Sequence, residues 1–182
     1  MPEFTPKPPE QRATIVTAWI HEDDLAYFHR ARRKFFPGHR NYLSAHLTLF
    51  HYVRPGVRDR FIEVARRTIT DQGLTAAREL AVKPPFSMGR GVAYGVEAAP
   101  LIALRQPLRD HFAPTLKQQD LNPWRKPHIT VQNKVTKPEA ERLARHLLRI
   151  WRPCSVRWVG LEFWRYDYGP WTLQERVEFG GR

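Results

Sequence analysis

The chain has 182 residues, 42% of them hydrophobic, and a net charge of +12. This length suits one domain, and the hydrophobic content excludes a disordered protein. A strongly basic chain favours an acidic partner, nucleic acid first, because bound phosphates release counterions; an uninvolved basic surface is the alternative. Its single cysteine, Cys154, excludes an intramolecular disulfide. No stretch is apolar enough for a membrane span or a signal peptide, so we expect a cytoplasmic protein.

The first half of the chain alternates strands and helices after an N-terminal tail over residues 1–12, which we expect to be flexible because it is rich in proline. Apolar runs and alternation predict strands here, and apolar residues three or four positions apart predict helices. Pro84 and Pro85 predict a loop between the last two strands. In chain order, the expected elements are a strand over 13–20, a helix over 25–35, a strand over 46–53, a helix over 57–72, and strands over 78–83 and 92–98.

The second half repeats this order of helix, strand, helix, strand and strand. Its expected elements are a helix over 101–112, a strand over 128–135, a helix over 137–151, and strands over 155–166 and 171–179. Thr136 and Glu139 form a capping-box pattern at the second helix. We interpret the match as an internal repeat, with one bilobal domain over 13–182 and lobes over 22–98 and 101–179. A chance match between two helix-strand units is the alternative.

Two four-residue stretches share the pattern His, aliphatic, Thr, aliphatic, each within an expected strand. They are His46-Leu47-Thr48-Leu49 and His128-Ile129-Thr130-Val131, and their histidines lie 82 positions apart. Side chains alternate across a strand, so the histidine and the threonine of each motif point to the same face. A pseudo-twofold relation between the lobes would place the two strands on either side of a central groove, where two half-sites form one site.

The histidines and threonines of the two motifs suit acid–base chemistry on a phosphate diester. Imidazole titrates near neutral pH, so one histidine can take a proton from the attacking oxygen while the other gives one to the leaving oxygen. Threonine hydroxyls can stabilise the charge that develops on the phosphate oxygens. The predicted catalytic residues are therefore His46, Thr48, His128 and Thr130, with no metal and no cofactor. The alternatives are structural histidines or a zinc site, although neither motif has a Cys, Asp or Glu at ligand spacing.

Basic and aromatic residues near the motifs and in the last strand pair are candidates for substrate binding. Basic side chains can meet phosphate, and aromatic rings can stack on a nucleobase. Core packing or a solvated face is the alternative for the aromatic residues. The candidate substrate-binding residues are Arg125, Lys126, Phe50, Tyr52, Trp164 and Tyr166.

These residues together resemble a known family. The paired motifs, the Lys126-Pro127 pair before the second motif, and the stretch Phe163-Trp164-Arg165-Tyr166-Asp167 are similar to the two-histidine (2H) phosphoesterase superfamily. More narrowly, the chain resembles the LigT-like 2′-5′ RNA ligase / RNA 2′,3′-cyclic phosphodiesterase family over residues 13–179. The resemblance implies an α+β, bilobal, pseudo-twofold fold, in which two antiparallel sheets line a central cleft and the helices lie outside.

The resemblance also implies an activity. Members hydrolyse a 2′,3′-cyclic phosphate without a metal, typically leaving a 2′-phosphate, and some join RNA ends reversibly through a 2′-5′ linkage. By position, His46 and His128 would be the acid–base pair, in either order, and Thr48 and Thr130 the phosphate-binding hydroxyls. We expect a cofactor-free monomer that acts on RNA or nucleotides with 2′,3′-cyclic phosphate ends and not at a membrane. The alternatives are a 2H phosphodiesterase for 2′-5′ oligonucleotides or another small cyclic phosphate, and a non-catalytic RNA-binding module.

Overall fold

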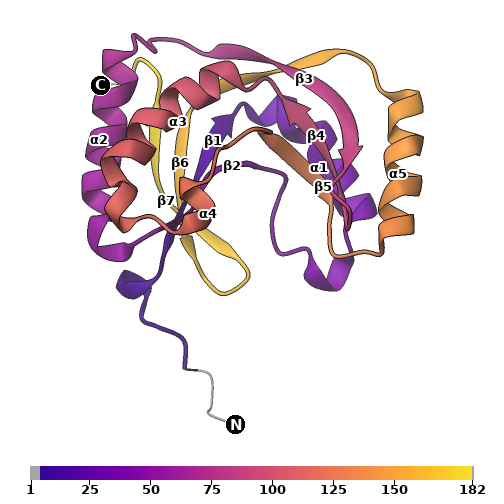
Figure 1. Ribbon diagram of the computed structural model, residues 1–182, viewed down its shortest axis with the longest axis horizontal. Coiled ribbons are helices and arrows are strands. Elements are labelled where there is room, and N and C mark those ends of the chain that lie inside the picture. Colours follow the sequence, from indigo (N-terminus) through magenta and orange to yellow (C-terminus); the bar gives the residue numbers. More distant parts are fainter. Residues whose placement is uncertain (1–4, 182) are drawn as a thin grey trace.

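The computed structural model describes residues 5–181 and contains the two matching series of helices and strands expected from the sequence (Figure 1). The strands are β1 (Thr14–Ile20), β2 (Leu47–Val53), β3 (Arg78–Ser87), β4 (Val92–Val96), β5 (His128–Gln132), β6 (Cys154–Tyr166) and β7 (Trp171–Glu178). The helices are α1 (Glu22–Phe35), α2 (Arg58–Asp71), α3 (Ala99–Phe112), the short α4 (Gln118–Leu121) and α5 (Lys137–Ile150). The four long helices of the described chain have 14 residues each, so corresponding helices of the two series match in length.

The strands within residues 5–181 belong to one seven-stranded antiparallel sheet. Their order is β2-β1-β6-β3-β4-β5, and β7 also pairs with β6. The long strand β6 makes the sheet continuous, because its residues 154–158 pair with β3 and its residues 158–165 pair with β1. The α+β class is therefore confirmed, and the two sheets expected from the sequence are joined through β6.

The molecule has two lobes that are not consecutive segments of the chain (Figure 1). The first lobe contains β1, β2, the second half of β6 and β7, with α2 and α3 packed on each other. The second lobe contains β3, β4 and β5, with α5 against β3 and β4, and α1 against β5. The helix α1 precedes the first motif in sequence but packs on the strand of the second. The expected lobe bounds, 22–98 and 101–179, are wrong for this reason.

Phe61 of α2 lies at the centre of the first lobe's core. Its ring centroid is 5.1 Å from that of Phe50 on β2, 4.5 Å from that of Phe112 on α3, and 6.4 Å from that of Phe163 on β6. All four side chains are buried. Removing a phenylalanine side chain from water contributes about 1.5–3 kcal/mol, so this cluster helps to hold α2 against the sheet.

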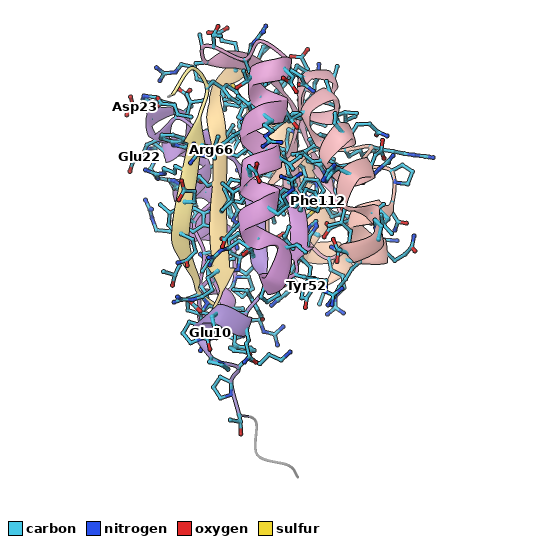
Figure 2. All side chains as sticks on the ribbon, turned by 90° about the vertical axis from the view of Figure 1, so that its left-hand side faces the viewer. Glu10, Glu22, Asp23, Tyr52, Arg66 and Phe112 are labelled. Carbon is cyan, nitrogen blue, oxygen red and sulfur yellow. The ribbon has the colours of Figure 1, made fainter. Side chains whose placement is uncertain are left out.

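The outer surface of the first lobe is polar. Figure 2 shows α2 running along this side next to the β6–β7 hairpin, with Arg66 on the helix. Arg66 forms an ion pair with Glu175 of β7 at 2.5 Å. An exposed pair of this kind contributes about 0–1 kcal/mol, less than the aromatic packing beneath it. No helix within residues 5–181 combines the length and the apolar character needed to cross a membrane.

β3 and β5 end at different positions from those expected. β3 continues through Pro84 and Pro85, because a register shift between Val82 and Pro85 places the prolines where the ladder is already interrupted. β5 ends at Gln132 instead of residue 135. The backbone turns away shortly afterwards, at Lys134, which has a left-handed φ of 62°.

Residues 7–12 are attached to the turn between β6 and β7. The backbone N–H of Lys7 donates to the Tyr168 hydroxyl at 2.8 Å, and Arg12 pairs with Asp167 at 2.6 Å. Hydrogen bonds from Arg165, Thr172 and Arg12 hold the pKa of this aspartate far below its ordinary value. Of the tail expected to be flexible, residues 1–4 lie outside the described residues, and the later part makes these contacts.

Candidate active site

The two motif strands, β2 and β5, lie at opposite ends of the strand order but contact each other in space. The sheet therefore bends until its end strands meet (Figure 1). Each motif strand keeps one edge without a strand partner, and the carbonyl groups along that edge need other donors. Two buried arginines supply them.

Arg32 of α1 connects the two motifs. Its side chain is 5% exposed, and its Nε donates to Asn41 Oδ1 and to the Leu43 carbonyl oxygen, both at 2.9 Å. Its Nη1 donates to the carbonyl oxygen of Thr130 at 3.0 Å. Leu43 closely precedes the first motif and Thr130 belongs to the second, so one side chain links the segment that leads into the first motif to the second motif. Burial lowers the pKa of Arg32 to about 10, which leaves the group charged at pH 7.

Arg105 of α3 holds the free edge of β2 in a similar way. Its Nε donates to the Leu49 carbonyl oxygen at 2.8 Å, and its Nη2 donates to the Asp120 carbonyl oxygen at 2.5 Å. The Asp120 carboxylate accepts hydrogen bonds from the backbone N–H groups of His51 and Tyr52, each at 2.9 Å. The edge of β2 is therefore closed by α3 and α4 instead of by another strand.

Each motif strand has a β-bulge directly after its threonine. Thr48 and Phe50 pair with neighbouring residues of β1, so one extra residue stands between them in β2. Thr130 and Gln132 pair in the same way with neighbouring residues of β4. A bulge interrupts the alternation of side chains. The histidine and threonine precede the bulge and share a face, whereas the residue after the bulge turns inward and is buried in both strands.

Phe50 consequently lies in the core and not on the face of His46 and Thr48. Its side chain is 0% exposed. The ring packs against Phe61, and the Arg105 guanidinium lies 4.8 Å from its centroid. The expectation that Phe50 binds substrate is wrong, because side chains do not alternate across a bulge.

The same local contact holds both motif histidines. His46 Nδ1 lies 2.7 Å from the Ser44 carbonyl oxygen, and His128 Nδ1 lies 2.8 Å from the Lys126 carbonyl oxygen. A carbonyl oxygen only accepts, so Nδ1 carries a proton in each ring and the neutral ring presents an unprotonated Nε2. Within residues 5–181 neither Nε2 has a hydrogen-bond partner, so both are available to a substrate.

The electrostatic surroundings keep His46 neutral. Burial of the ring, together with the positive charge of Arg32, lowers the pKa of His46 to about 4. His51 and His128 also lower this pKa when they are protonated, and the hydrogen bond to Ser44 raises it. His46 is therefore suited to accept a proton at pH 7.

Thr48 and Thr130 are partly exposed on the strand faces that carry the histidines. Among the described residues, neither threonine hydroxyl has a hydrogen-bond partner. Both hydroxyls can therefore donate to an oxygen of a bound phosphate.

Lys126 and Trp164 flank the site. The Lys126 ammonium lies 5.5 Å from the centroid of the Phe86 ring, and that ring lies 6.1 Å from the ring of His128. Trp164 lines a cavity beside His46. The structure thus places one predicted binding residue next to each motif.

Tyr52, Arg125 and Tyr166 have other surroundings. Lys117 Nζ lies 3.6 Å from the centroid of the Tyr52 ring, and Arg125 lines a separate cavity of about 190 Å³. Tyr166 packs against another tyrosine ring at 5.6 Å. These three residues do not line the cavity beside His46, so their contact with substrate stays a prediction.

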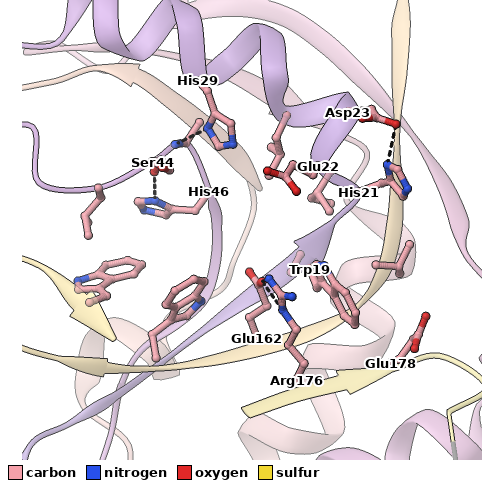
Figure 3. Close-up of a pocket in the computed structure, with 18 of the residues that line it drawn as sticks. Trp19, His21, Glu22, Asp23, His29, Ser44, His46, Glu162, Arg176 and Glu178 are labelled. Carbon is pink, nitrogen blue, oxygen red and sulfur yellow. Dashed lines mark hydrogen bonds and ion pairs between the residues drawn. The ribbon is translucent and has the colours of Figure 1, made fainter. Parts of the chain in front are cut away.

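The cavity beside His46 has a volume of about 680 Å³ (Figure 3). Two tryptophans form the wall next to the histidine: the Trp171 ring lies 4.6 Å from the His46 ring and 6.4 Å from the Trp164 ring. Farther along, Glu162 and Arg176 form an ion pair at 2.9 Å. The cavity and the first motif histidine therefore belong to one continuous site.

Three residues that shape the site were not predicted from the sequence: Arg32, Arg105 and Glu162. Arg32 and Arg105 lie on amphipathic helices, where arginine normally faces water, so periodicity offers no signal for their burial. Glu162 could have been found, because it is a lone carboxylate between Leu161 and Phe163 in an expected strand.

Replacing Arg32 with methionine is expected to lower the free energy of unfolding by about 2–4 kcal/mol, because buried acceptors lose their donor. The same change should raise the pKa of His46, since the charge of Arg32 lowers it. Denaturant unfolding and an NMR titration of the His46 ring measure the two effects. Arg33→Met, at an exposed neighbour, is the control. Equal effects of the two substitutions would contradict the linking role of Arg32.

Among solved structures, this fold is that of LigT and related phosphoesterases. The chain is similar to Escherichia coli LigT complexed with 3′-AMP, with a TM-score of 0.65 and 17% identity over 93% of this chain and 99% of that one. A protein from Thermus thermophilus has a TM-score of 0.65 and 18% identity over 93% and 98% of the two chains. A further phosphoesterase has a TM-score of 0.63 and 17% identity over 94% and 99%. At these identities the likeness establishes the fold.

Residues 20–170 match the sequence model of the 2′-5′ RNA ligase superfamily. The chain therefore belongs to this superfamily of phosphoesterases and ligases, and the resemblance seen in its two motifs is confirmed. No curated protein matches the chain.

Proposed function

We propose that this protein hydrolyses 2′,3′-cyclic phosphates on RNA ends or nucleotides and leaves a 2′-phosphate. The observation that carries the proposal is the matched pair of imidazoles, each with Nδ1 bonded to a carbonyl and Nε2 open. Cleavage of a phosphate diester needs one base and one acid, which this pair supplies. LigT structures with 3′-AMP, ATP and NADP+ support a nucleotide substrate for the same fold. The net charge of +12 also favours a phosphate-bearing substrate.

In the proposed reaction His46 is the base and His128 is the acid. His46 is neutral at pH 7 because its pKa is about 4, and its Nε2 takes a proton from the water that attacks phosphorus. The bond between phosphorus and O3′ breaks, and protonated Nε2 of His128 gives its proton to O3′. The products are a 2′-phosphate and a free 3′-hydroxyl, and solvent then resets both imidazoles.

Three groups stabilise the phosphate in this scheme. Negative charge develops on the non-bridging oxygens, and the hydroxyls of Thr48 and Thr130 donate to them. Lys126, two residues before His128, adds a positive charge. An RNA 5′-hydroxyl in place of water would form a 2′-5′ linkage by the same proton transfers, so the proposal includes reversible ligation.

The proposal requires hydrolysis without added metal. Purified protein in excess EDTA should hydrolyse a 2′,3′-cyclic nucleotide as fast as protein without EDTA, and chromatography should identify the 2′-monophosphate as the product. Protein treated with EDTA and then supplied with Mg²⁺ is the control. Activity that disappears in EDTA and returns with metal would reject the two-imidazole mechanism. RNA binding that weakens with salt, without turnover of any substrate, would instead identify a binding module.

A further inference from the structure

We infer that the 680 Å³ cavity beside His46 binds the nucleobase of the nucleotide whose phosphate lies between the motif histidines, and that guanine fits it best. This inference rests on the proposed function, because it places a nucleotide in the same site. It names the part of the substrate that the two motifs do not contact.

A row of side chains leads from the first motif into the cavity. Thr48 of β2 is directly opposite Thr17 of β1, Thr17 is opposite Glu162 of β6, and Glu162 is opposite Arg176 of β7. Residues directly opposite on neighbouring strands point to the same face of a sheet. Glu162 and Arg176 therefore lie on the face that carries the motif threonine.

The part of the cavity nearest the histidine is aromatic. The Trp171 ring lies 4.6 Å from the His46 ring, and the Trp164 ring lies 6.4 Å from the Trp171 ring. The Trp164 indole N–H donates to Thr17 Oγ1 at 2.9 Å, which fixes the orientation of that ring. Stacking on an aromatic ring contributes about 1–3 kcal/mol per base, so this wall suits a flat base next to the bound phosphate.

The polar end of the cavity presents both an acceptor and a donor. Glu162 is 9% exposed, and its Oε1 accepts two hydrogen bonds from Arg176, at 3.1 Å and 2.9 Å. Its Oε2 accepts one, from Thr17 at 3.3 Å, so one acceptor position on Oε2 remains. Arg176 lies over the Trp19 ring at 4.7 Å and lines the cavity, and its bonds to Glu162 use Nε and Nη2, which leaves Nη1 to donate to a base. One edge of a nucleobase can therefore donate a hydrogen bond to Glu162 and accept one from Arg176 at the same time.

The carboxylates that line the cavity disfavour a phosphate group and favour a ligand that presents N–H donors. Although the chain has a net charge of +12, the lining includes the carboxylates of Glu22, Asp23, Glu162 and Glu178. Carboxylates accept hydrogen bonds and repel anions. Guanine presents two neighbouring N–H groups and one carbonyl oxygen, so it can use the open position on Glu162, a second carboxylate of the lining and the Arg176 donor together. Uracil presents one N–H group between two carbonyl oxygens, so it leaves the second acceptor unused and turns a carbonyl oxygen toward it.

The test compares kcat/KM for 2′,3′-cyclic GMP and 2′,3′-cyclic UMP. Wild type should prefer the guanine substrate by about tenfold to a hundredfold, the discrimination expected of a well-placed hydrogen-bonding pair. The ratio should fall toward one in Glu162→Gln and in Arg176→Met. Glu175→Gln, on the same strand β7 but outside the cavity, should keep the wild-type ratio. The Arg176 side chain is 48% exposed, so Arg176→Met should not disturb folding. If Glu162→Gln does not fold, Arg176→Met alone decides the result.

The outcomes separate this inference from the proposed function. Turnover of both substrates at equal kcat/KM would overturn the guanine pocket and leave the proposed function intact. If neither substrate is turned over, tryptophan fluorescence measures binding of guanosine and uridine 2′-monophosphates. Tighter binding of the guanosine compound that Arg176→Met removes would then support the pocket and contradict the proposed function. Equal or absent binding would overturn both.

Discussion

Replacing either His46 or His128 with alanine is expected to reduce kcat on a 2′,3′-cyclic nucleotide by about a hundredfold to ten-thousandfold, the usual contribution of general acid–base catalysis. In the proposed mechanism each imidazole performs a different proton transfer, so neither can substitute for the other. The double variant should be only slightly worse than the single variants, because groups that act as a unit are not additive. Steady-state kinetics with each variant in EDTA measures the effect.

His146→Ala is the matched control for these substitutions. His146 is exposed on α5 and has no place in the site, so its loss should leave kcat within a fewfold of wild type. Thermal unfolding of all variants checks that the loss of activity is not a loss of fold. Activity within a fewfold of wild type in both motif variants would reject the assignment.

The acid limb of kcat/KM is expected near pH 4 instead of near pH 6.5. This profile reports the free enzyme, in which the base must be neutral to work. Burial and Arg32 lower the pKa of His46 to about 4, so the ring becomes protonated, and activity falls, only below that value. An acid limb near pH 6.5 would show that His46 is not the base.

The free energy of unfolding should also depend on pH, in the direction that the lowered pKa of His46 requires. Between pH 6.5 and pH 4 the unfolded chain binds a proton at His46 and the folded protein does not. The free energy of unfolding therefore falls as pH falls through this window. His46→Gln removes the titrating group and should flatten this part of the curve, which chemical denaturation at several pH values can measure. An unchanged slope in the variant would contradict the lowered pKa.

Local signals in the sequence predicted the helices and strands and the local geometry of the two motifs. Apolar periodicity located all four long helices of the described chain, and the capping box of Thr136 and Glu139 is present at the start of α5. The spacing of His and Thr placed both side chains on one strand face. These features depend on residues close in sequence, which a single chain shows directly.

Features that depend on distant partners could not be predicted in this way. The bulges after Thr48 and Thr130 appear only in the pairing with β1 and β4, so Phe50 was assigned to the wrong face. The helix α1 packs on β5 because their apolar surfaces fit together, and the order of the elements along the chain does not reveal this pairing. The burial of Arg32 follows from the free carbonyl groups it satisfies on Leu43, before the first motif, and on Thr130 in the second.

The central claim is that both motif imidazoles act on one phosphate, and a crystal structure of the protein with a nucleoside 2′-monophosphate tests it most directly. The phosphate should lie between the two rings, with oxygens within about 3.2 Å of Nε2 of both His46 and His128. A phosphate that contacts only one imidazole, or that binds away from both, would contradict the account.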